Sequence, residues 1–131
     1  MKNSTTKYGK WALITGGSAG IGKAIAQELA AKGHSLILVA RNEERLTRVA
    51  AEIEQRHEVQ VETYALDLTH PEDVQTMFAH TSDRFVGIVV ANAGLETSGH
   101  FTKVSLQEHR QLIELNINVP AAMAQHYGAK M

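Results

Sequence analysis

The chain has 131 residues, of which 44% are hydrophobic and 21% charged, and its formal net charge is −1. This composition is typical of one ordinary folded domain and excludes a disordered chain. The near-neutral charge excludes a strongly basic surface for nucleic acid or anionic lipid. Nothing approaches the ~18 consecutive apolar residues of a membrane span, and the polar segment 1–10 has no signal-peptide core.

Two residue types bear on location and metal binding. The chain has no cysteine, which excludes disulfides and thiolate metal sites and fits a reducing compartment, so we expect a cytoplasmic protein. The seven histidines show no H-E-x-x-H or other paired spacing for zinc, so we expect no metal site.

The first predicted elements are an apolar strand, Trp11–Thr15, a glycine-rich turn, and an alanine-rich helix that ends before Gly33. Glycines let a backbone approach a ligand closely, and the unpaired N–H groups at a helix start attract anionic oxygens. We therefore predict that the backbone from Ser18 to Gly22 binds a pyrophosphate; the alternative is a plain turn. The spacing of the turn is Thr15-Gly16-x-x-x-Gly20-x-Gly22.

The middle of the chain continues the alternation. Residues Ser35–Ala40 form a continuous apolar run, as in a parallel strand covered on both faces. Asn42 is expected to cap a helix with an apolar face at helical spacing. A third strand is predicted from about Val59 to Leu66, and Thr69-x-x-Glu72 is predicted to be a capping box that opens a short helix.

The last strand and helix are also strongly patterned. Residues Phe85–Ala91 are apolar, and a loop leads from them to a second capping box, Ser105-x-x-Glu108. A final helix is predicted from about Leu106 to Lys130. Four strands alternating with helices predict an α/β fold with a doubly wound parallel sheet (Rossmann fold), formed by one dinucleotide-binding domain over residues 1–131.

This sheet is expected to be incomplete. In the strand order 3-2-1-4-5-6 of a doubly wound fold, the fourth strand lies between the first and a fifth, which this chain lacks. Residues 86–91 would then be a bare apolar edge, which is a template for aggregation. Another segment or chain could cover it, but we expect that residues of the native protein are missing.

The end of the second strand indicates cofactor choice. A carboxylate at this point would accept from a ribose 2′-OH, whereas a guanidinium binds a 2′-phosphate with charge-assisted hydrogen bonds. This chain has Ala40-Arg41-Asn42, which favours NADP(H) over NAD. The alternative is an arginine in an ordinary exposed loop.

Four motifs together resemble the short-chain dehydrogenase/reductase family in its NADP-preferring form: the glycine turn, Ala40-Arg41-Asn42, Asp67-Leu68 and Asn92-Ala93-Gly94. The resemblance implies that Asp67 accepts from the adenine amino group and that Asn92–Gly94 lie against the ribose and nicotinamide. Without it, Asp67 would be a turn residue and Asn92–Gly94 a turn. The cofactor-binding residues predicted on these grounds are Thr15, Gly16, Ser18, Ala19, Gly20, Ile21, Gly22, Arg41, Asn42, Asp67, Leu68, Asn92, Ala93 and Gly94.

Asn116 is the predicted catalytic residue. Pro120 has no N–H to bond the carbonyl of Asn116, so the final helix should kink here and leave that carbonyl free. The resemblance implies that this carbonyl holds a water in a proton relay. The alternative is a tolerated polar residue beside a packing kink.

The resemblance also implies a later Ser and a Tyr-x-x-x-Lys motif, in which the tyrosine transfers the proton. Tyr127-Gly128-Ala129-Lys130 is one residue short of that spacing, so Tyr127 is interpreted as a packing residue. We therefore expect a chain truncated before its catalytic Ser/Tyr/Lys segment and inactive alone.

The resulting hypothesis is an NADP(H)-dependent oxidoreductase that transfers a hydride between nicotinamide and a small carbonyl or alcohol substrate. The resemblance implies a homodimer or homotetramer formed through the C-terminal helix. One alternative is a non-catalytic module that senses NADP(H). Another is a methyltransferase with a similar sheet, against which Arg41 argues because the adenosyl ribose calls for an acidic residue there.

Overall fold

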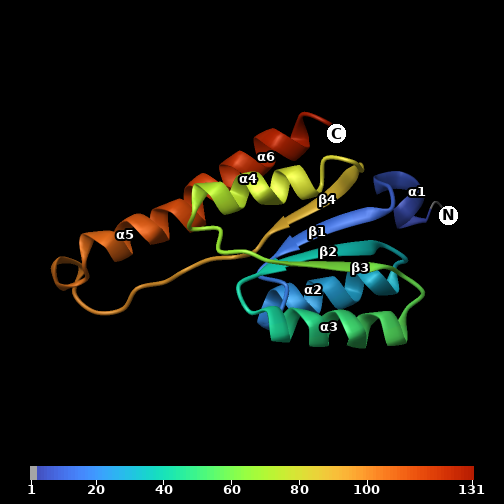
Figure 1. The fold of residues 1–131 in the computed structure, drawn as a ribbon, viewed down its shortest axis with the longest axis horizontal. Coiled ribbons are helices and arrows are strands. Elements are labelled where there is room, and N and C mark those ends of the chain that lie inside the picture. The colour runs from blue at the N-terminus through green and yellow to red at the C-terminus, as the bar shows by residue number, and fades with distance from the viewer. Residues whose placement is uncertain (1–2) are drawn as a thin grey trace.

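A computed structural model describes residues 3–131. Its four strands form one parallel sheet in the order β3-β2-β1-β4 (Figure 1). This arrangement confirms the predicted doubly wound topology, with the fourth strand beside the first. The strands are β1 (Trp11–Thr15), β2 (Ser35–Ala40), β3 (Val61–Ala65) and β4 (Val86–Ala91).

Helices cover both faces of the sheet. On one face lie α2 (Gly20–Ala31) and α3 (Glu43–Arg56), and on the other lie α4 (Pro71–His80) and the long C-terminal helix (Figure 1). Successive residues of a strand point to opposite faces, so each strand contributes to both cores. The first core joins Ala12, Ile14, Leu36 and Leu38 to α2 and α3, and the second joins Leu13, Ile37 and Val39 to Met77, Val119, Met123 and Tyr127.

The long C-terminal helix is interrupted where the sequence predicts it. It consists of α5 (Leu106–Ile113), a π-helix over Glu114–Asn118, and α6 (Val119–Gly128). The backbone N–H of Val119 bonds the carbonyl of Glu114, five residues earlier. Pro120 supplies no N–H to the next turn, and the interruption takes the form of this wider turn.

Two predicted helix caps are confirmed and one is wrong. Asn42 caps α3 and the capping box at Ser105 and Glu108 opens α5. Thr69 does not cap α4, because the helix begins at Pro71, in the first helical position that proline favours. The cap position therefore falls on His70, which makes no side-chain cap bond. The amide and hydroxyl of Thr69 instead both donate to Asp67.

A short N-terminal helix, α1 (Ser4–Tyr8), was not predicted, since it buries no residue and has no apolar pattern. It packs against the start of β4, where the backbones approach so closely that a Cβ on Gly87 would lie 1.6 Å from the carbonyl oxygen of Tyr8. The fully buried His34 holds it in place: Nε2 lies 2.7 Å from Ser4 Oγ, and Nδ1 lies 3.1 Å from the carbonyl oxygen of Gly9.

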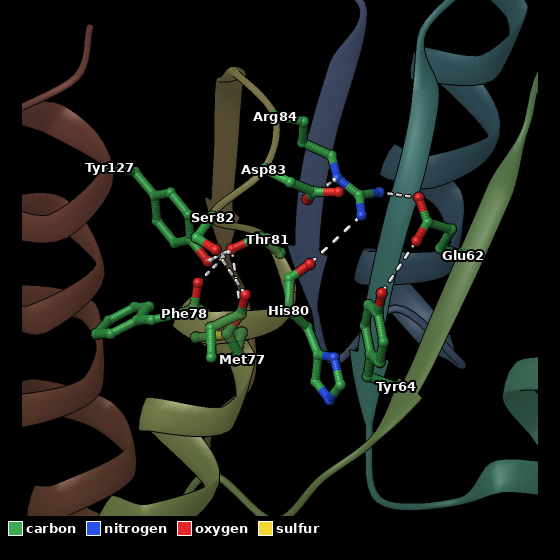
Figure 2. A network of polar contacts seen from close by, with 11 residues as sticks. Glu62, Tyr64, Met77, Phe78, His80, Thr81, Ser82, Asp83, Arg84 and Tyr127 are labelled. Atoms are coloured by element: carbon green, nitrogen blue, oxygen red, sulfur yellow. Dashed lines mark hydrogen bonds and ion pairs between the residues drawn. The ribbon is translucent and has the colours of Figure 1, made fainter.

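A polar network joins the amino-terminal ends of the strands to α4 and α6 (Figure 2). Arg84, just before β4, pairs with Glu62 of β3 and Asp83, and its guanidinium carbon lies 4.9 Å from the centre of the Trp11 ring. In the same network, Thr81 at the end of α4 bonds Tyr127 of α6.

Strand β4 forms the predicted edge of the sheet, since within residues 3–131 it pairs with β1 alone. A hollow lies beside it, lined mainly by small and apolar residues of β4 and α6, among them Val89, Met123 and Tyr127. The expectation that residues of the native protein are missing at this edge stays a prediction, as does the alternative that another segment or chain covers it. None of the helices described combines the length and apolar character needed to cross a membrane.

Candidate functional site

A cavity of about 640 Å³ opens at the carboxyl-terminal ends of the four strands. Its volume lies within the ~300–1,000 Å³ of ligand sites, and this edge is where open α/β sheets bind their ligands. All four strand–helix connections contribute to it. It is lined by Gly16, Ser18 and Ala19; by Val39, Ala40, Arg41, Asn42 and Arg45; by Leu66, Asp67, Leu68 and Thr69; and by Asn92, Ala93, Gly94, Leu95 and Leu115.

The glycine turn is shaped by close packing. Gly16 has a φ of +66° and Gly20 a φ of +55°, in the region that favours glycine. A Cβ on Gly22 would lie 2.2 Å from the carbonyl oxygen of Gly16 and 2.6 Å from Nδ2 of Asn92. Helix α2 begins behind the turn with no side-chain cap and no acidic residue in its first turn. Its first N–H groups are therefore suited to an anion.

Thr15 links the first strand to the end of the fourth. Its hydroxyl accepts from the backbone N–H groups of Asn92, at 3.1 Å, and Ala93, at 3.0 Å. The side-chain amide of Asn92 in turn donates to the carbonyl of Gly16 at 3.2 Å. Thr15 is only 1% exposed and does not line the cavity. Its hydroxyl therefore positions Asn92 and Ala93, while its predicted cofactor contact stays a prediction.

The connection after β2 brings two arginines to the cavity. Arg41 follows the strand directly, and Arg45 is the third residue of α3. The side-chain oxygen of Asn42 accepts the backbone N–H of Arg45 at 2.9 Å, which fixes the start of α3. Asn42 therefore reaches the cavity with its oxygen already bonded to the helix.

Asp67 presents a carboxylate after β3. Its Oδ1 accepts from the hydroxyl of Thr69 at 2.7 Å and from its N–H at 3.0 Å. Partial burial raises the pKa of Asp67, but these hydrogen bonds and the charges of His70 and Arg41 lower it by more, so the pKa lies below its usual value. The carboxylate is thus ionised at neutral pH and can accept a hydrogen bond.

Asn116 lies in the π-helix, next to the cavity wall. Its Oδ1 accepts the backbone N–H of Leu95 at 2.8 Å, and its Nδ2 donates to the carbonyl of the same residue at 2.6 Å. Leu95 and Leu115 line the cavity, whereas Asn116 does not. A Cβ on Gly94 would lie 3.1 Å from Asn116 Oδ1, so a small residue is needed there. The predicted water relay through Asn116 stays a prediction.

Ten of the predicted residues line this one cavity, although 76 positions separate the glycine turn from Asn92. Those that do not line it are Thr15, Gly20, Ile21, Gly22 and Asn116. The lining residues outside the predicted set are Ala40, which the sequence analysis used only to mark the end of the second strand, and Val39, Arg45, Leu66, Thr69, Leu95 and Leu115. The signal that could have identified Arg45 is its place in the first turn of the helix that Asn42 was predicted to cap, next to the predicted phosphate site at Arg41.

Tyr127 lies away from this cavity. It is 3% exposed, and its hydroxyl lies 2.8 Å from that of Thr81. Burial raises the pKa of Tyr127, and the hydrogen bond with Thr81 opposes this. Its interpretation as a packing residue is confirmed by its place in the core.

Comparison with known proteins supports this geometry. A family model described as short chain dehydrogenase matches residues 10–131. A 7β-hydroxysteroid dehydrogenase from Collinsella aerofaciens is 31% identical over 125 residues, which are 95% of this chain and 48% of that protein.

Two solved structures resemble the whole sheet. A short-chain dehydrogenase from Sphingobium yanoikuyae, in complex with NADPH, has a TM-score of 0.88 at 34% identity, covering 92% of this chain and 48% of the other. A bulky-bulky ketone specific alcohol dehydrogenase from Comamonas testosteroni also has a TM-score of 0.88, at 33% identity, with 92% and 49% covered. The chain therefore spans about half the length of the proteins that it matches.

Proposed function

This chain belongs to the short-chain dehydrogenase family, and we propose that it is the NADP(H)-binding half of an oxidoreductase. The observation that carries the proposal is the cavity itself. It gathers a glycine turn before an uncapped helix, an arginine after β2, a carboxylate after β3 and small residues after β4. Taken in chain order, these groups match a pyrophosphate, a 2′-phosphate, an adenine amine, and a ribose with its nicotinamide.

In this proposal each group of residues has a separate binding task. The backbone N–H groups at the start of α2 hold the pyrophosphate, and Arg41 holds the 2′-phosphate. Asp67 accepts from the adenine amino group, and Asn92–Gly94 let the ribose and nicotinamide lie against backbone. The bound dinucleotide supplies hydride chemistry toward a small carbonyl or alcohol substrate. The chain itself binds and orients.

Asn116 is proposed to contribute at the substrate end of this cavity. It holds Leu95, a wall residue, by two hydrogen bonds, and its π-helix is the kind of local widening often found at functional sites. Tyr127 is not proposed as the proton donor, because its hydroxyl is buried against Thr81.

We further propose a homo-oligomer, dimer or tetramer, formed through the long C-terminal helix. The support is the exposure of apolar side chains along it: Leu106 is 63% exposed, Ile113 46% and Ile117 57%. Large exposed apolar patches mark interaction sites in many proteins. The proposed cytoplasmic location rests instead on the absence of cysteine.

Titration calorimetry with NADPH, NADH and S-adenosylmethionine tests the proposal. We expect NADPH to bind more tightly than NADH and S-adenosylmethionine not to bind. Arg41→Asp should reverse the preference between NADPH and NADH, because a carboxylate repels a 2′-phosphate and accepts from a 2′-OH. Equal binding of both dinucleotides by the wild type would overturn the assignment of Arg41. Binding of S-adenosylmethionine alone would favour a methyltransferase. A sensor would bind NADPH yet lack Tyr-x-x-x-Lys in its full-length gene.

A further inference from the structure

A second guanidinium, that of Arg45, lies on the same cavity wall as Arg41. The two residues are four positions apart, and Arg45 is in the first turn of α3. Arg41 lies on the connection before the helix and Arg45 lies within it. Both residues line the cavity.

The start of α3 is fixed in a way that positions Arg45. The Asn42 side chain accepts the backbone N–H of Arg45 at 2.9 Å, and the Asn42 carbonyl accepts from Leu46 at 3.0 Å. Leu46 is 1% exposed and packs in the core between α3 and the sheet, which fixes the position of this turn. The backbone of Arg45 is therefore held at both sides, and only its side chain is free to move.

The charges around the two arginines are unbalanced. Among residues 3–131, no carboxylate lies within 4 Å of the guanidinium of Arg41 or Arg45. Carboxylates are available, since Glu43 and Glu44 lie in the same helix turn. Glu44 instead pairs with Arg48, at 3.5 Å, on the helix surface outside the cavity. The Asp67 carboxylate also lines the cavity, and the charge of Arg41 lowers its pKa, but within residues 3–131 it forms no ion pair with either arginine. Both guanidinium groups can therefore bind a dianion.

We propose that Arg45 is a second ligand of the 2′-phosphate and that, with Arg41, it determines the preference for NADP(H). The inference rests on the proposed function, which assigns this site to Arg41 alone. A phosphate monoester carries nearly two negative charges at neutral pH and three acceptor oxygens, so it can accept from two guanidinium forks at once. One arginine neutralises about half of that charge.

The test is the affinity of the chain for 2′,5′-ADP, measured by titration calorimetry beside that for 5′-ADP, which lacks the 2′-phosphate. The variants are Arg45→Gln, Arg45→Lys and Arg41→Gln. Arg48→Gln is the matched control, because it removes the same charge from the same helix outside the cavity. Binding of 5′-ADP, together with circular dichroism, reports whether each variant is folded.

We expect Arg45→Gln to weaken 2′,5′-ADP about five- to tenfold and to leave 5′-ADP unchanged, as expected for one solvent-exposed charged hydrogen-bond pair. The affinity of Arg45→Lys for 2′,5′-ADP should fall between those of the wild type and Arg45→Gln, because lysine keeps the positive charge but cannot donate two parallel hydrogen bonds. Arg48→Gln should bind like the wild type.

If Arg45→Gln binds 2′,5′-ADP as the wild type does while Arg41→Gln weakens it, the second ligand is refuted and the proposed function stands. Equal weakening by Arg45→Gln and Arg48→Gln would also refute it, since net charge would then explain the loss. If the wild type binds 2′,5′-ADP no better than 5′-ADP, both proposals fail together.

Discussion

The side-chain amide of Asn116 makes both of its hydrogen bonds to the backbone of one residue, Leu95, at 2.8 and 2.6 Å. This pairing joins the π-helix to the loop that follows β4, across 21 positions of sequence. The side-chain amide of Asn116 thus pairs with the N–H and the carbonyl of Leu95, as a neighbouring strand would do in a sheet. The loop wall of the cavity therefore depends on the helix for its position.

Replacement of Asn116 by Ala should release this loop. Removing both hydrogen bonds should lower the free energy of unfolding by about 1–2 kcal/mol and speed hydrogen exchange at the Leu95 amide. Asn118→Ala is the control, since Asn118 lies in the same π-helix and its side chain donates to Glu114 at 2.7 Å rather than to the loop. Exchange at Leu95 that is equally slow in both variants would show that the pairing does not hold the loop.

The sequence predicted the frame of the molecule well, because strand, turn and helix signals are local. The apolar runs of β1, β2 and β4, the glycine turn and the cap at Asn42 each depend on a few adjacent residues. The strand order then followed from the general rules of doubly wound sheets. The interruption before Pro120 was also predictable, since the missing N–H is a property of proline alone.

The features that were missed depend on contacts between distant residues. The hydroxyl of Thr15 bonds amides 77 and 78 positions away, which no local pattern reveals. The cap predicted at Thr69 was wrong because α4 begins at Pro71, which moves the cap position to His70, while Thr69 donates to Asp67, two residues earlier. Helix α1 lacks an apolar face, and it is held by His34 instead.

Two glycines of the phosphate turn should differ sharply in their tolerance of alanine. Gly22→Ala would place a Cβ 2.2 Å from the carbonyl oxygen of Gly16, so the turn and Asn92 must move apart. We expect a loss of about 3 kcal/mol in the free energy of unfolding by urea, with loss of NADPH binding. Gly20→Ala meets nothing within 4 Å and bears only the strain of its positive φ, about 1–2 kcal/mol. A Gly22→Ala variant as stable as Gly20→Ala would contradict this packing.

Acid should weaken the fold partly through Asp67. Its pKa is lower in the folded chain than its ordinary value of 3.8, because the hydrogen bonds from Thr69 and the charges of His70 and Arg41 outweigh the effect of burial. A lowered folded pKa gives stability that is present above the unfolded pKa and is lost as the pH falls through the folded pKa. The loss should therefore develop below about pH 4.

Asp67→Asn isolates this contribution, since the amide oxygen can still accept from Thr69 but does not titrate. Urea unfolding between pH 6 and pH 3 should show a shallower loss of stability for Asp67→Asn than for the wild type. Thr69→Val is the companion variant, because it keeps the carboxylate and removes the hydroxyl donor, and it too should flatten the profile. Superimposable pH profiles for all three proteins would rule out a linkage through Asp67.

The buried hydroxyls of Thr81 and Tyr127 should be energetically coupled (Figure 2). Thr81 also lies 3.0 Å from the carbonyl oxygen of Met77, so its hydroxyl can donate there and accept from Tyr127. Tyr127→Phe removes one hydrogen bond and should cost about 1 kcal/mol of unfolding free energy. Thr81→Val leaves the tyrosine hydroxyl buried without a partner and should cost more, about 2–3 kcal/mol.

A double-mutant cycle measures this coupling. Once Tyr127 is phenylalanine, the valine at position 81 leaves no hydroxyl unpaired, so the double variant should be more stable than the sum of the single losses implies. The expected interaction energy is about 1 kcal/mol, measured by urea unfolding at neutral pH. Strictly additive losses would mean that the two hydroxyls do not exchange a hydrogen bond.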